Sequence, residues 1–118
     1  MTREGKKKFL GQYQEYRQAI KQRCMQLQQQ KSTLSQDISL EFNIAQREEE
    51  LKQEVADYND KCNEIEQAIQ TVPEIFLQTI LRFYYINGLT WEEVADETGY
   101  DVRHIRRLRD EALDTLQI

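Results

Sequence analysis

The sequence has few of the residues that interrupt helices. Of its 118 residues, one is proline and four are glycine. So few of these residues leave few tight turns available, because proline and glycine supply most of them. With 31% charged and 39% hydrophobic residues, the composition suits a protein of long helices with much exposed surface. We therefore expect an all-α fold.

Long hydrophobic runs are also absent. No stretch of about 18 apolar residues occurs, so we expect no transmembrane span and no membrane partner. The first residues, MTREGKKKFLGQYQEY, lack the apolar core of a signal peptide. The expected location is the cytoplasm.

Residues that bind metals or perform catalysis are scarce. The two cysteines, Cys24 and Cys62, lie in no CxxC motif and have no histidine near them, and His104 is the single histidine. The sequence therefore has no zinc or redox motif, no Ser/His/Asp set and no phosphate-binding loop. We expect no enzyme, no metal and no cofactor, and we interpret the cysteines as reduced thiols.

The net charge of −5 is unevenly distributed. Residues 1–31 hold eight basic and two acidic residues, residues 32–72 three and ten, and residues 73–118 five and nine. A basic segment followed by an acidic one of similar length indicates that the two lie against each other. In the last segment, four of the five basic residues fall between Arg103 and Arg109.

Two long helices are predicted before residue 72. The first spans about residues 8–31, with one apolar stripe, and Gly11 is a weak point in it. The second carries a heptad-like seam and an acidic remaining surface. We expect the two to form an antiparallel hairpin, with Cys24 near Arg47 or Glu48 and no Cys24–Cys62 disulfide. The stripe comprises Tyr13, Tyr16, Ile20, Cys24 and Leu27, and the seam comprises Ile44, Leu51, Val55, Tyr58, Cys62, Ile65, Ile69 and Val72.

The segment between these helices is ambiguous. Residues 32–39 are predicted to be a connector, because they are rich in serine, threonine and aspartate. Apolar and polar residues then alternate over residues 38–44, which is the period of a strand. We favour a loop that enters the second helix. A helix, or a strand paired across a dimer, is left open as an alternative, and the seam is also suited to a homodimer.

The single proline, Pro73, sets the predicted domain boundary at Val72–Pro73. Residues 1–72 would form the hairpin, a candidate oligomerisation segment, and residues 73–118 a three-helix domain. Thr71 and Glu74 fit a capping box at the start of its first helix, which would end at Gly88. The predicted inner face of that helix consists of Ile75, Phe76, Thr79, Ile80, Phe83 and Tyr84.

Residues 90–108 have the pattern of a helix-turn-helix motif. Thr90 and Glu93 form a second capping box. Ala95 is small where two helices would cross, and Gly99 permits the positive φ of the turn. Asp101 would then cap the last helix.

The start of that last helix is the candidate DNA-binding site. The N-terminal half of a recognition helix enters the major groove, where arginine can bind guanine bidentately. We assign base contacts to Val102, Arg103, Arg106 and Arg107, and phosphate contacts to His104, Arg109 and Arg82. Acidic side chains of the preceding helix should point away from DNA or toward a protein; these are Glu92, Glu93, Asp96 and Glu97.

The stretch LRFYYINGLTWEEVADETGYDVRHIRRLRDEALDTL resembles region four of bacterial sigma factors. The likeness covers about residues 73–117 and includes the segments Tyr84–Gly88 and Ala112–Leu116. It departs at Asp110 and Glu111, where many sigma domains continue with basic residues. The whole layout resembles small phage regulators of the RinA and ArpU type. This resemblance implies a phage or prophage transcription regulator that binds double-stranded promoter DNA, with RNA polymerase as a candidate further partner.

Two other functions fit the same layout. One is a phage packaging protein resembling a small terminase subunit, which would form a ring. The other is a protein-interaction module acting on RNA polymerase. The DNA target, the direction of regulation and the oligomeric state do not follow from the sequence.

Overall fold

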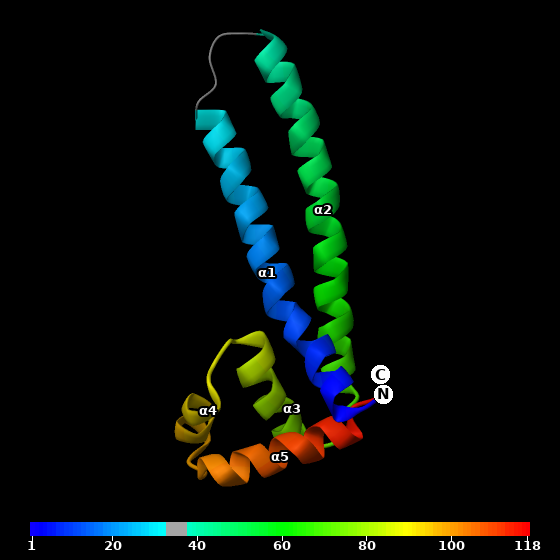
Figure 1. The fold of residues 1–118 in the computed structure, drawn as a ribbon, viewed down its shortest axis with the longest axis vertical. Coiled ribbons are helices and arrows are strands. Elements are labelled where there is room, and N and C mark those ends of the chain that lie inside the picture. Colours follow the sequence, from blue (N-terminus) through cyan, green and yellow to red (C-terminus); the bar gives the residue numbers. More distant parts are fainter. Residues whose placement is uncertain (33–37) are drawn as a thin grey trace. The chain divides into compact units, whose positions relative to one another are not determined.

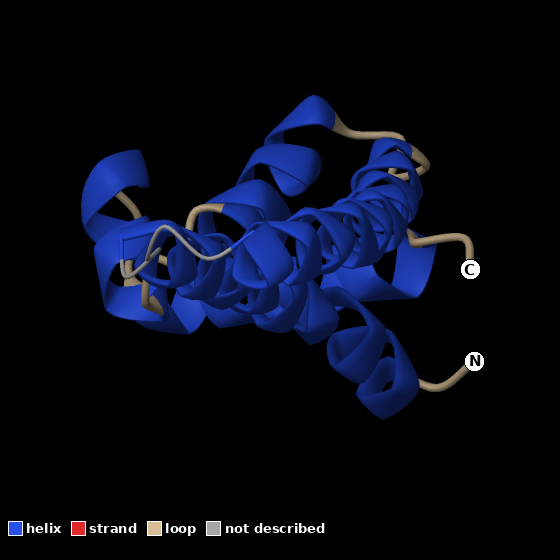
Figure 2. Ribbon diagram, turned by 90° about the horizontal axis from the view of Figure 1, so that it is seen from above, coloured by secondary structure: helices blue, strands red, loops and turns tan. Residues whose placement is uncertain are grey.

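The computed structural model describes the backbone of residues 1–32 and 38–118 and the side chains of residues 1–29 and 45–118. Figure 1 shows the order of the elements, and Figure 2 shows that those described are helices joined by loops. The all-α prediction is confirmed. The elements are α1 (Arg3–Ser32), α2 (Ile38–Gln70), α3 (Ile75–Leu81), the π-helical turn η1 (Arg82–Ile86), α4 (Trp91–Thr98) and α5 (Val102–Thr115).

The described chain divides into two compact units. Residues 15–62 form one, which we call the hairpin unit, and residues 1–14 together with 63–118 form the other, the C-terminal unit. The sequence suggested a single boundary at Val72–Pro73. In the structure, the first turns of α1 and the last turns of α2 instead belong with α3, α4 and α5. These turns belong there because their buried side chains form one core with those of α3, α4 and α5.

Helix α1 begins before the predicted start at Lys8. The hydroxyl oxygen of Thr2 accepts the N–H of Gly5 at 3.1 Å, and the carbonyl of Thr2 accepts the N–H of Lys6 at 2.9 Å. Thr2 therefore caps the helix, since a threonine there satisfies an N–H that has no partner within the helix. Glu4 in the first turn interacts favourably with the positive end of the helix dipole.

In the hairpin unit, α1 and α2 pack against each other as predicted. Arg23 Nε donates to Glu54 Oε2 at 2.8 Å, and this carboxylate raises the pKa of the Arg23 guanidinium. The Tyr16 and Tyr58 rings stack with centroids 5.7 Å apart. Leu51 is 3% exposed, and it contributes one of the few buried side chains of this unit.

The register of the hairpin differs from the predicted one. We expected Cys24 near Arg47 or Glu48. Cys24 and Glu48 do line one groove, but Arg23 binds Glu54, more than one turn further along α2 than the predicted register. Heptad spacing defines which side of each helix faces the other, but not how far the helices slide. Cys24 is exposed and Cys62 is buried, and no disulfide joins them.

Residues 38–44 are helical, so both the favoured loop and the alternative strand were wrong. These residues form the first turns of α2. A helix satisfies its backbone hydrogen bonds locally, whereas a strand needs a partner, and none of the described residues forms one. Ser32 closes α1 and Ser39 lies in α2, whereas positions 33–37 of the predicted connector lie outside the described residues.

The inner face of α3 and η1 also differs from the prediction. Ile75 is 79% exposed and Phe76 is 37% exposed, although both were expected in the core. The helix begins at Ile75 with Glu74 as its N-cap, and no side chain caps it. Thr71 instead donates to the carbonyl of Ala68 at 2.6 Å, so the predicted Thr71–Glu74 box is absent. The observed inner face consists of Leu77, Ile80, Leu81 and Tyr85.

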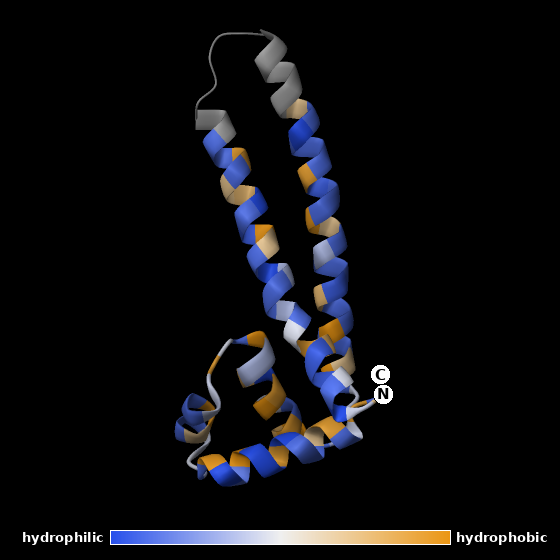
Figure 3. Ribbon diagram, in the orientation of Figure 1, coloured by the Kyte–Doolittle hydropathy of each residue, from blue (hydrophilic) through white to orange (hydrophobic). Residues whose placement is uncertain are grey.

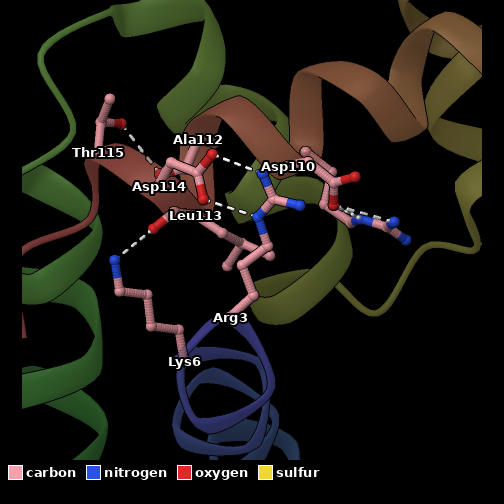
Figure 4. Close-up of polar contacts among 8 residues, drawn as sticks. Arg3, Lys6, Asp110, Ala112, Leu113, Asp114 and Thr115 are labelled. Atoms are coloured by element: carbon pink, nitrogen blue, oxygen red, sulfur yellow. Dashed lines mark hydrogen bonds and ion pairs between the residues drawn. The ribbon is translucent and has the colours of Figure 1, made fainter. Parts of the chain in front are cut away.

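The first turns of α1 are bound to α5 within the C-terminal unit (Figure 4). Arg3 donates to both carboxylate oxygens of Asp114, at 2.7 and 2.6 Å, and Lys6 Nζ donates to the carbonyl of Leu113 at 2.7 Å. Leu10 is fully buried, and the Tyr13 hydroxyl donates to Glu66 at 3.1 Å. The start of the chain thus contributes both apolar and ionic contacts to this unit.

No helix in the described part of the chain is both long and apolar enough to cross a membrane.

Replacing Leu51 with aspartate should unfold the hairpin unit. The change removes a buried apolar side chain and places a charge at a position that is only 3% exposed. It should lower the free energy of unfolding by at least about 3 kcal/mol. We expect a loss of helicity by circular dichroism and a lower melting temperature. Gln53→Asp adds the same charge at an exposed position of α2 and should change neither. Normal melting of Leu51→Asp would contradict the seam.

The Arg3–Asp114 pair should make the start of α1 sensitive to acid. The hydrogen bonds from Arg3 lower the pKa of Asp114 below its ordinary value of 3.8. The pair therefore contributes stability above that value and loses it as the pH falls through the lower folded pKa. At about pH 7, Asp114→Asn should reduce amide hydrogen-exchange protection in the first turns of α1, and the difference from the wild type should shrink as the pH falls through the folded pKa of Asp114. Glu111→Gln is the control. An undiminished difference in acid would refute the assignment.

Candidate nucleic-acid interface

Helix α4 begins with the predicted capping box. The Thr90 hydroxyl accepts the N–H of Glu93 at 3.2 Å, and the Glu93 carboxylate accepts the N–H of Thr90 at 3.3 Å. Two N–H groups that have no partner within the helix are thereby satisfied. The capping box confirms this part of the sequence prediction and fixes where α4 starts.

The turn between α4 and α5 also follows the prediction. Gly99 has φ of 76°, and its N–H donates to the carbonyl of Ala95 at 2.9 Å. Asp101 caps α5, because its carboxylate accepts the N–H of Arg103 at 3.4 Å. Ala95 is 4% exposed, and α5 packs against both α3 and α4. A small residue at this position lets the two helices approach closely.

Helix α5 has one buried and one exposed side. Hydrophobic positions alternate with hydrophilic ones along it in Figure 3. Leu108 is only partly buried, whereas Leu113 is fully buried. Arg103, Arg106 and Arg107 are exposed on the N-terminal half of the helix. The buried side comprises Ile105, Ala112, Leu113 and Leu116.

Of the seven residues predicted to contact DNA, Arg103, Arg106 and Arg107 are exposed, and the other four are partly buried: Arg82, Val102, His104 and Arg109. Within the part of the chain that the structure describes, neither Arg103 nor Arg107 forms an ion pair. Arg106 differs, since its guanidinium lies 3.5 Å from the Glu92 carboxylate of α4, with the two side chains 54% and 66% exposed. At least one acidic side chain of α4 thus reaches the arginine cluster instead of pointing away from it.

Arg109 occupies a different environment from the other arginines. Its side chain is 19% exposed, lies 5.5 Å from the Trp91 ring centroid and pairs with Asp110 at 3.1 Å. Trp91 in turn stacks on Tyr84, with ring centroids 4.0 Å apart and planes within 5°. These contacts favour a role in packing α5 onto the start of α4 over the predicted phosphate contact. The charge spacing in the sequence could not separate Arg109 from its neighbours.

An open hollow of about 630 Å³ adjoins this aromatic stack. Its walls include Lys7, Gln14, Trp91 and Arg109. Burial raises the pKa of Tyr85, which also lines it, to about 12, so its phenol stays protonated at neutral pH. Among the described residues, no group of three or more histidine, cysteine, aspartate or glutamate side chains is placed to hold a metal ion.

An aromatic cluster that the sequence did not indicate lies beside the arginines. The Phe76 and Tyr100 rings are 5.4 Å apart, and Tyr100 and His104 are 5.1 Å apart. Phe76 and Tyr100 are exposed, as is Ile75, which precedes Phe76 at the start of α3; we call these three residues the Phe76 patch.

Comparison of the chain with protein-family models, with curated proteins and with solved structures finds no match. The arrangement of its own residues therefore carries the functional argument.

Alanine substitutions at Gly99 and at Gly11 should change the stability of the protein in opposite directions. A Cβ added to Gly99 or to Gly11 would meet no atom within 4 Å, so only backbone conformation distinguishes them. Gly99→Ala forces a left-handed φ on alanine and should destabilise the protein by about 1 kcal/mol. Gly11→Ala lies in helical backbone of α1 and should stabilise it by about 0.5–1 kcal/mol. Urea unfolding measures both, and equal effects would contradict the assigned turn.

Proposed function

We propose that this protein is a sequence-specific DNA-binding transcription regulator. The observation that carries the proposal is the row of exposed arginines, Arg103, Arg106 and Arg107, on the first half of a helix that is capped, preceded by a tight turn and packed through its other side. In helix-turn-helix proteins this half of the second helix enters the major groove. The likeness of residues 73–117 to sigma region four, and of the whole layout to small phage regulators, agrees with this function and suggests a phage or prophage promoter as the target.

The base contacts would come from Arg103, Arg106 and Arg107, with Val102 beside them. An arginine can donate two hydrogen bonds to O6 and N7 of guanine, and each such pair is worth about 1–3 kcal/mol of discrimination. His104 would contact the DNA backbone at the edge of this surface. Arg109 is less suited to do so, because Trp91 and Asp110 already engage its guanidinium.

The Glu92 carboxylate would compete with DNA for the guanidinium of Arg106. This carboxylate neutralises Arg106 in the absence of a ligand, and the exposure of both side chains makes this pair weak and easily exchanged. Phosphates and guanine acceptors would replace the carboxylate on binding. The overall charge of −5 also opposes nonspecific binding, so the affinity would depend on contacts made by the arginine cluster itself.

A protein-interaction module is the second candidate, and the Phe76 patch favours it. Exposed apolar side chains grouped on one surface mark sites of protein association more often than isolated ones do. The two candidates differ in their response to salt. DNA binding through several phosphates weakens by orders of magnitude between about 50 and 200 mM salt, whereas apolar docking does not.

Selection from a random duplex library, followed by sequencing of the bound pool, tests the proposal. We expect an enriched motif for the wild type. Arg106→Ala should relax the preference at one base position, with an affinity loss of about 1–3 kcal/mol and unchanged helicity. Arg47→Ala removes the same charge from α2 and should leave the motif intact. No enrichment at low or moderate salt would overturn the proposal and favour a protein partner.

Glu92→Gln tests whether the Glu92 carboxylate competes with DNA for Arg106. It should tighten binding by releasing Arg106 while leaving the motif unchanged, because it removes a competitor and no DNA contact. A uniform loss of affinity for all duplexes in Arg106→Ala would make Arg106 a phosphate contact instead.

A further inference from the structure

The hairpin unit has an open groove between α1 and α2. Its volume is about 300 Å³, and residues of both helices line it. The apolar part of the lining includes Leu51, Val55 and Ala56 from α2 and Cys24 and Leu27 from α1. Leu51 lies at its base, because it is 3% exposed, whereas Cys24 and Ala56 are exposed. The groove is thus an apolar depression on the surface of the unit.

Two helices do not cover the heptad seam. Leu51 and Cys62 are buried, but Ile20, Leu27, Val55 and Tyr58 remain partly exposed although they occupy core positions of the repeat. In four-helix bundles, positions of this kind are covered by a second pair of helices. The half-covered seam and the groove lie in the same unit, so a further helical layer would bury both.

The charges of the two helices identify the occupant. Within this unit α1 carries Arg17, Lys21 and Arg23 among its described residues, against the single acidic Glu15. Helix α2 has the opposite bias, and one pair across the hairpin, Arg23–Glu54, already uses it. A second copy turned by a twofold axis along the hairpin would set its α1 against this α2 and its α2 against this α1. The acidic residues of α2 in this stretch are Glu48, Glu49, Glu50, Glu54, Asp57 and Asp60.

We propose that the groove of the hairpin unit binds the hairpin of a second copy of this chain, forming an antiparallel four-helix homodimer. The interface is isologous, because the same groove and the same charges occur on both copies. Arg23, Glu48 and Lys52 at the groove supply polar contacts around an apolar centre. Packing α1 on α1 of the partner would instead bring like charges together, so the charge pattern selects the twofold described.

Ala56→Arg tests the dimer by analytical ultracentrifugation of the full chain. Ala56 is exposed, so the arginine leaves the folded single chain intact but places an unpaired charge in the interface. We expect a concentration-dependent dimer for the wild type and dissociation at least about tenfold easier for the variant. Gln53→Arg adds the same charge outside the groove and should dimerise like the wild type. Equal helicity and melting of the dilute variants establish that each is folded.

The thiol of Cys24 gives an independent readout. It lines the groove and is exposed in the single chain, so its reaction with a thiol reagent should slow as the wild type is concentrated. Ala56→Arg should abolish this protection. A wild type that stays monomeric, a thiol whose rate ignores concentration, or a dimer unaffected by Ala56→Arg would overturn the proposal. A larger ring would also overturn it and would favour a packaging protein. These two measurements use the protein without DNA, so a failure of the proposed DNA binding would not change their outcome.

Discussion

The burial of one side of α5 is the constraint on which the C-terminal unit depends. Ile105, Ala112 and Leu113 are fully buried, and the helix packs on both α3 and α4. A helix repeats every 3.6 residues, so once these positions face inward the directions of all its other side chains follow. Arg103, Arg106 and Arg107 are exposed because hydrophobic burial fixes the rotation of the helix, and no contact among the arginines themselves is needed.

The ends of α4 and α5 could be predicted from the sequence because local chemistry determines them. Free backbone N–H groups at the helix starts are satisfied by Thr90 with Glu93 and by Asp101, and the positive φ of the turn is permitted by Gly99. Each of these effects acts within a few residues along the chain, and all four residues behave as expected. Apolar periodicity likewise sufficed to predict the two long helices. These features need no knowledge of what lies elsewhere in the chain.

The features that were missed depend on tertiary packing. Ile75 and Phe76 are apolar and suitably spaced, yet their exposure is set by where α3 starts and by the π-helical turn that follows it. Arg109 has the same charge as Arg107, but Trp91 lies beside it. The slide of α1 along α2 is fixed by particular pairs such as Arg23 with Glu54, which a repeating pattern leaves undetermined.

The contact between Arg3 and Asp114 joins residues 111 positions apart in the sequence. Leu10 and Tyr13 are likewise buried in a unit whose other members follow residue 62. Synthesis must therefore reach Asp114 before the Arg3–Asp114 pair can form, and by then both helices of the hairpin have already been made. Until α5 has been synthesised, the apolar side of the first turns of α1 therefore stays exposed. Contacts of such long range also slow folding, because the entropic cost of closing the loop comes before the contacts can stabilise the fold. Helix α5, which carries the exposed arginines, is thus the element whose synthesis allows the first turns of α1 to pack.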